Sequence, residues 1–88
     1  MAGRRMSPVP DYSPMDCAQY SRLELAILKK RALHLRWTGR GITHIEVVRP
    51  VDLRTRRHAE YLILCDALER RRILRLDRIL RFEVLERG

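Results

Sequence analysis

The chain has 88 residues, of which 45% are hydrophobic and 34% are charged, and its net charge is +8. This composition indicates one small globular domain and excludes a disordered chain or a second hydrophobic core. The apolar runs are far shorter than the roughly 18 residues of a membrane span, and the basic start is not followed by the apolar part of a signal peptide, so we expect a cytoplasmic protein without a membrane contact.

The positive charge lies after the first third of the chain. Residues 1–28 have no net charge, and the basic residues that follow are nearly all arginine. The planar guanidinium group suits phosphate and carboxylate recognition, which favours a polyanionic partner. Alternatively, the arginines only solvate the outward faces of a small β domain. Composition leaves both interpretations open.

The N-terminal part of the chain divides into an arm and a helix. Residues 1–15 hold three prolines among small polar residues, which predicts a flexible arm before a single domain at residues 16–88. Asp16 is placed to cap a helix, and Gln19 three residues later completes a capping-box pattern. Apolar residues at helical spacing then predict one helix from Cys17 to about Leu28 that lies on a sheet.

Alternating apolar and polar residues predict five strands after this helix. The first two, residues 32–38 and 42–48, are joined by a hairpin turn at Gly39–Gly41. A loop broken by Pro50 is expected at residues 49–58. The other three strands are expected at residues 59–65, 71–76 and 77–85, with Leu80, Phe82 and Val84 sharing one face of the last and with Trp37, Tyr61 and Phe82 directed inward.

The predicted fold class is mainly β, in an α+β arrangement. An N-terminal helix should precede a small five-stranded antiparallel barrel of the Sm-like or SH3-like kind, because connections this short favour antiparallel neighbours. An OB-type barrel is the structural alternative. Such barrels close a sheet on itself, so the expectation includes a closed sheet.

Catalytic chemistry finds little support in the sequence. His34, His44 and His58 are scattered, and none has the spacing to cysteine or acidic residues that a zinc site needs. His44 and Glu46 are read as a solvated pair on a strand. No nucleophile elbow or phosphate-binding loop is present. We therefore expect a binding protein rather than an enzyme, without metal, cofactor or small-molecule substrate.

Three segments of the chain resemble a known family. They are residues 16–26, which read DCAQYSRLELA, residues 51–62, which read VDLRTRRHAEYL, and residues 73–79, which read ILRLDRI. In this order and spacing they are similar to the Rof (YaeO) family of Rho-binding antiterminators, over about residues 11–82. The family fold is a helix followed by an Sm-like barrel, so the resemblance implies a Rof-type domain at residues 16–88.

The resemblance implies that the chain binds the termination factor Rho, a hexameric RNA helicase. Family members occupy or adjoin the primary RNA-binding site of Rho, keep RNA off it and so inhibit Rho-dependent termination. The implied Rho-binding residues lie on the helix and in the loop before the third strand: Cys17, Tyr20, Ser21, Glu24, Arg56, Arg57 and His58. From helical spacing alone, Tyr20 serves equally well as part of the packing stripe of the helix.

A run of arginines after the third strand raises a second hypothesis. Together with arginines further on, the run can form a basic stripe, which would make the chain an Sm-like RNA-binding module. Because few aromatic residues are available to stack on bases, a solvated charge run is the competing interpretation, and RNA is a secondary partner. The possible RNA contacts are Arg70, Arg71, Arg72 and Arg75.

Overall fold

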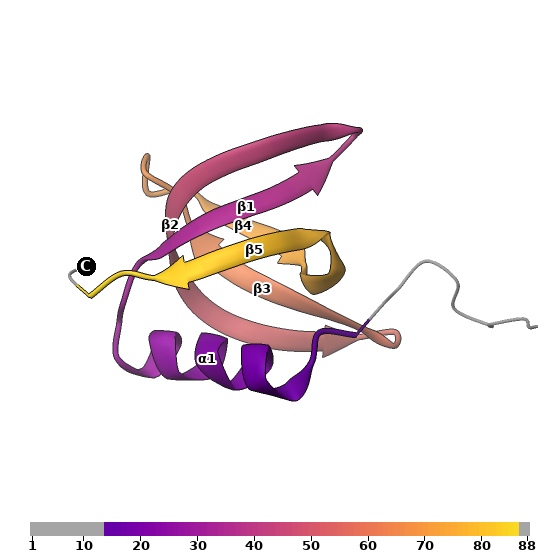
Figure 1. Ribbon diagram of the computed structural model, residues 1–88, viewed down its shortest axis with the longest axis horizontal. Coiled ribbons are helices and arrows are strands. Elements are labelled where there is room, and N and C mark those ends of the chain that lie inside the picture. The colour runs from indigo at the N-terminus through magenta and orange to yellow at the C-terminus, as the bar shows by residue number, and fades with distance from the viewer. Residues whose placement is uncertain (1–13, 87–88) are drawn as a thin grey trace, which may run out of the picture.

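The structure, a computed structural model, describes residues 14–86 and consists of one helix followed by five antiparallel strands (Figure 1). Nearly all of the expected arm at residues 1–15 lies outside the described residues. The predicted fold class, mainly β with a leading helix, is confirmed. In chain order the elements are α1 (Cys17–Leu28), β1 (Leu33–Gly39), β2 (Ile42–Arg56), β3 (Ala59–Cys65), β4 (Arg71–Arg75), the 3-10 turn η1 (Leu76–Arg78) and β5 (Ile79–Val84).

The sheet bends strongly but does not close. Its strand order is β4-β3-β2-β1-β5, so β4 and β5 are its two edges, and within the described residues no backbone ladder joins them. The chain passes from one edge to the other through η1, and Figure 1 shows the long β2 curving around the interior. The expected closed barrel is thus an open sheet, because η1 replaces the hairpin that would have paired its edges.

Helix α1 begins and ends as the sequence predicts. The carboxylate of Asp16 accepts a hydrogen bond of 2.8 Å from the backbone N–H of Gln19. The side chain of Gln19 accepts a hydrogen bond from Arg22 instead of completing a capping box. Leu23 and Ala26 are the buried residues of the helix, at 0% and 2% exposure, and they attach it to the core.

The turn between β1 and β2 confirms the predicted hairpin. Arg40 and Gly41 are its two central residues, with φ of 54° and 75°, as in the turns whose twist matches that of antiparallel strands. Gly39 precedes them and lies against the ring of Trp37. A Cβ atom on Gly39 would stand 2.8 Å from Cζ3 of that ring, so the ring can occupy its place only beside a glycine.

The expected loop at residues 49–58 is wrong, because β2 continues through it to Arg56. β2 pairs with β1 up to Val48 and with β3 from Arg49 onward. A bulge between Pro50 and Asp52 accommodates the proline, which a bulged strand tolerates because part of the ladder is already interrupted. A two-residue turn then leads into β3.

A second irregularity changes which residues of β5 face inward. The ladder between β1 and β5 shifts its register between Arg36 and Trp37, so that Trp37 pairs with Ile79 and Leu35 with Phe82. The predicted common face of Leu80, Phe82 and Val84 is therefore wrong for Leu80, which is 55% exposed. The core lies between the bent sheet and α1 and consists of Leu23, Ala26, Leu33, Leu35, Val48, Leu62, Leu64, Leu74, Leu76 and Phe82.

Candidate anion-binding groove

A groove of about 690 Å³ lies between the β1–β2 hairpin and the edge of the sheet formed by β3 and β4. On one side lies the tip of the β1–β2 hairpin, and on the other lie β3, β4 and η1. Inward-facing side chains of β1 and β2 line it because strand residues alternate between the two faces. The groove is lined by Trp37, Gly39, Arg40, Ile42, His44, Tyr61, Leu64, Arg72, Ile73, Leu74, Arg75 and Arg78.

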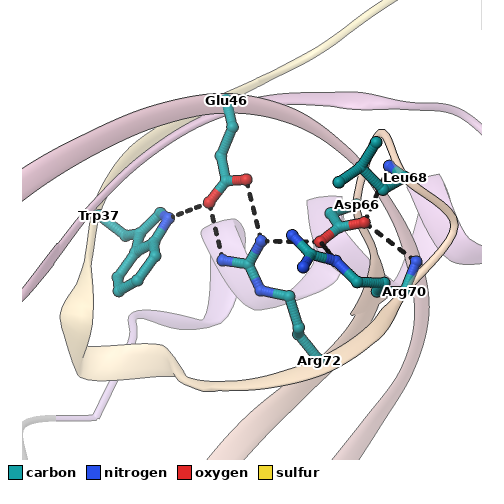
Figure 2. Close-up of polar contacts among 6 residues, drawn as sticks. All are labelled: Trp37, Glu46, Asp66, Leu68, Arg70 and Arg72. Atoms are coloured by element: carbon teal, nitrogen blue, oxygen red, sulfur yellow. Dashed lines mark hydrogen bonds and ion pairs between the residues drawn. The ribbon is translucent and has the colours of Figure 1, made fainter.

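An ion-pair network ties the two sides of this groove together (Figure 2). Arg72 on β4 donates two hydrogen bonds to the carboxylate of Glu46 on β2, at 3.1 and 2.9 Å. The same guanidinium donates a third, of 3.1 Å, to Asp66. Glu46 also accepts a hydrogen bond of 2.7 Å from Nε1 of Trp37. These hydrogen bonds lower the pKa of Glu46 below its usual value, chiefly through Arg72. A side-chain bridge therefore joins β2 to β4, two strands that share no ladder.

Asp66 organises the turn that precedes β4. Its buried carboxylate accepts backbone hydrogen bonds from Leu68 and Arg70, at 2.9 and 3.0 Å, as well as side-chain hydrogen bonds from Arg70 and Arg72. These bonds, led by the backbone N–H of Arg70, lower the pKa of Asp66 from 3.8 to about 2. Asp66 is thus ionised at neutral pH and holds Arg72 in position.

The side of the groove formed by the hairpin carries two stacked rings. The rings of Trp37 and His44 have centroids 4.2 Å apart and planes inclined by 14°. The guanidinium of Arg72 lies 5.8 Å from the centroid of the Trp37 ring. The expectation of a solvated pair at His44 and Glu46 is wrong, because both side chains are half-buried: His44 lines the groove, and Glu46 is bonded to Trp37 and Arg72. One feature of the sequence indicates this inward orientation. His44 and Glu46 precede the buried Val48 by four and two residues, so all three side chains point to the same face of β2.

The arginines of the groove differ in their partners. Arg72 is neutralised by Glu46 and Asp66, and Arg75 forms an ion pair of 2.7 Å with Asp77. Arg40 and Arg78 are exposed, and no carboxylate between residues 14 and 86 pairs with either of them. The groove thus has a neutralised interior and a positively charged rim, which is an arrangement that attracts anions.

The residues predicted to contact RNA do not form one stripe. Arg72 and Arg75 line the groove, whereas Arg70 lies in the turn before β4 and pairs with Asp66 at 3.1 Å. Arg71 is exposed, and alternation along β4 places it on the same face as Arg75 and on the opposite face from Arg72. Because Arg72 is separated from Arg71 and Arg75 in this way, and Arg70 lies outside the strand, the four arginines do not form one stripe.

The residues implied to bind Rho lie outside the groove. Those from the helix, Cys17, Ser21 and Glu24, are exposed on α1, and Tyr20 is half-buried and packs against the core. Arg56, Arg57 and His58 are exposed at the tight β2–β3 turn, where the last two have positive φ. Tyr20 lies near Glu60, Glu24 and Asp52, and burial together with these carboxylates raises its pKa.

Between residues 14 and 86, no three histidine, cysteine, aspartate or glutamate side chains are grouped so as to hold a metal ion. None of the helices in that range is long and apolar enough to cross a membrane.

The stability of the domain at acidic pH should depend on Asp66. Because its pKa falls on folding, its contribution is fully present above pH 3.8 and is lost as the pH falls toward about 2. We expect the melting temperature of Asp66→Asn to lie below that of the unmodified chain at pH 5 to 7 and to converge with it near pH 2. Thermal unfolding by circular dichroism across this range measures the effect, and parallel curves would contradict it.

Comparisons with known proteins identify the family. The family model of the WYL domain matches residues 18–84. Among solved structures, proteasome accessory factor B/C (PafBC) of Arthrobacter aurescens aligns with 99% of this chain at a TM-score of 0.73 and 22% identity. At that identity the alignment shows a shared fold, and it spans 13% of the PafBC chain. No curated protein matches the sequence.

These findings correct the resemblance to the Rof family. The match to the WYL model and the alignment with PafBC overturn the proposed membership, and with it Rho binding and the alternative of an Sm-like RNA-binding module. The three segments that carried the resemblance are a capped helix start and alternating strand patterns, which many helix-plus-sheet folds need, so they reported the fold rather than a site. Since the WYL domain model covers most of the length of this chain, the chain belongs to the WYL domain family.

Proposed function

We propose that this WYL domain serves transcription regulation as a sensor domain that binds a nucleotide unit in its groove. The match to the WYL domain suggests transcription regulation, which supports the regulatory part of the proposal, and we infer a cytoplasmic location with it. The chain acts by binding and not by catalysis. Its ligand is a planar base that carries a phosphate, presented either by a single strand of nucleic acid or by a free nucleotide.

One observation carries this proposal: flat rings and unpaired arginines line the same groove. The stacked pair of Trp37 and His44 offers a planar surface, and bases stack on such rings with little regard to sequence. Arg40 and Arg78 at the rim suit the phosphate. Because Arg72 is already held by two carboxylates, the charge that is available to a ligand lies at the rim, and the base is expected to face the interior.

The test is the binding of fluorescein-labelled single-stranded DNA and RNA at about 0.1 M salt, with free nucleotides as competitors. We expect Arg78→Glu to weaken binding about tenfold, because a reversed charge faces the phosphate. The matched control is Arg81→Glu, which changes the net charge equally but lies on β5 outside the groove, and it should change affinity less than about twofold.

Trp37 provides a second measurement, because it is the single tryptophan of the chain. A base that stacks in the groove should quench its fluorescence with the same concentration dependence as the binding signal. Equal losses of affinity in Arg78→Glu and Arg81→Glu, or binding of the probe without any change in Trp37 emission, would show that only the overall charge attracts the probe. Competition by mononucleotides distinguishes a free nucleotide from a strand.

A further inference from the structure

The outer face of β2, β3 and β4 carries an apolar centre that the core does not use. Leu62 and Leu64 of β3 point inward and are buried, so Tyr61 and Ile63 point to the opposite face. Tyr61, which was expected to be directed inward, therefore lies on the outer face, where it and Ile73 border both the groove and the hollow described below. The bulge after Pro50 keeps Asp52 and Arg54 of β2 on the same outer face, opposite Ile63 and Tyr61 respectively.

Cross-strand pairing brings the apolar side chains of this face together. Ile63 lies directly opposite Ile73 of the edge strand β4, and Tyr61 is the next outward residue of β3. Opposite residues in an antiparallel pair have Cβ atoms about 5 Å apart, so their side chains touch. Ile73 is 65% exposed although it is a large aliphatic residue. A hollow of about 570 Å³ lies over this centre, lined by Arg54, Thr55, Arg56, Tyr61, Ile63 and Ile73.

Arginines flank the apolar centre on both sides along the strands. Arg54 and Arg75 stand opposite Tyr61 on its two neighbouring strands, and Arg49 and Arg71 stand in the same way opposite Cys65. Arg49 and Arg54 pair with Glu69 and Asp52 at 3.3 and 2.9 Å, through side chains that are about half exposed or more. Such surface pairs contribute little stability, so a carboxylate of a partner can replace them.

We propose that this outer face is a docking surface for an acidic protein segment with an apolar anchor residue. The anchor fills the hollow over Ile63 and Ile73, and flanking carboxylates pair with the surrounding arginines. Tyrosine and arginine around a small apolar centre are the composition of the energetic centre of protein interfaces. The centre is mainly aliphatic and offers bases one half-buried ring, which favours a protein over nucleic acid. A second copy is disfavoured because each chain carries +8.

The test uses a short fluorescein-labelled peptide in which central leucines are flanked by glutamates, at fixed ionic strength. Ile63→Thr and Arg54→Glu are suitable variants, because both residues line the outer hollow and not the groove. Each should weaken peptide binding at least about fivefold, as expected for residues central to an interface. The matched controls Leu80→Thr and Arg81→Glu lie on β5 and should change it less than about twofold.

Amide chemical shifts of the labelled protein should change along β2, β3 and β4 when the peptide is added, and a peptide with glutamine in place of leucine should not bind. The proposal is overturned if the variants behave like their controls, or if the glutamine peptide binds equally well. It is also overturned if Ile63→Thr and Arg54→Glu weaken the binding of single-stranded DNA as much as that of the peptide, which would assign the face to nucleic acid, or if a concentration-dependent dimer is lost in Ile63→Thr. Since neither variant lines the groove, failure here leaves the nucleotide test unaffected.

Discussion

Replacing Leu23 with alanine should destabilise the domain by about 3 kcal/mol, the largest single effect that we expect. Leu23 is 0% exposed and, with Ala26, forms the buried part of the contact between α1 and the core. Its removal leaves a cavity that neighbouring leucines on separate strands cannot fill without moving the helix. For a small domain with a total stability of roughly 5 to 15 kcal/mol, this is a substantial fraction.

The same helix supplies the control for this prediction. Leu25 has the same side chain two positions further on but is 49% exposed, because successive helical residues face different directions. Leu25→Ala should change the free energy of unfolding by less than about 0.5 kcal/mol. Urea unfolding followed by far-ultraviolet circular dichroism measures both variants. Similar losses of the free energy of unfolding in Leu23→Ala and Leu25→Ala would mean that α1 packs on the sheet through another face.

The second large effect is expected for Arg72→Ala, which should lower the free energy of unfolding by about 2 kcal/mol. The substitution leaves Glu46 and Asp66 without the cation that they share, and both carboxylates are mostly removed from water, with side chains 26% and 4% exposed. The loss should be smaller than for a fully buried pair, because the side chain of Arg72 is itself 34% exposed and water screens its charge.

Two further variants separate the causes of this loss. Arg70→Ala also removes a partner of Asp66, but its side chain is 66% exposed and does not reach Glu46, so the loss should be below about 1 kcal/mol. Arg72→Met keeps the apolar stem and removes only the charge. In Arg72→Ala the emission of Trp37 should also shift, because Glu46 then loses its second partner. Two results together would show that the bridge from β2 to β4 does not act on the groove: unchanged Trp37 emission in Arg72→Ala, and an equal loss of the free energy of unfolding in Arg70→Ala and Arg72→Ala.

Local patterns in the sequence were sufficient for individual elements. Asp16 and the apolar spacing after it predicted α1 with its observed start, and the glycine beside Arg40 predicted the first hairpin. The second hairpin was missed because Arg57 and His58 adopt positive φ without the glycine or asparagine that normally marks such a turn. Pro50 was read as a break in the strand because the bulge that accommodates it depends on pairing with β3, and the local sequence does not reveal that pairing.

By itself, then, the sequence determined that this chain has a capped helix followed by short alternating strands, since helix and strand periodicity arise from the local geometry of the backbone. The tertiary structure alone decided that Ile79 instead of Leu80 faces inward, that Tyr61 faces outward, and that the sheet stays open. It also brought Arg72 to Glu46 across 26 positions of sequence. The physical reason is that bulges and strand order are set by contacts between distant segments, and a shift of one residue exchanges the two faces of a strand.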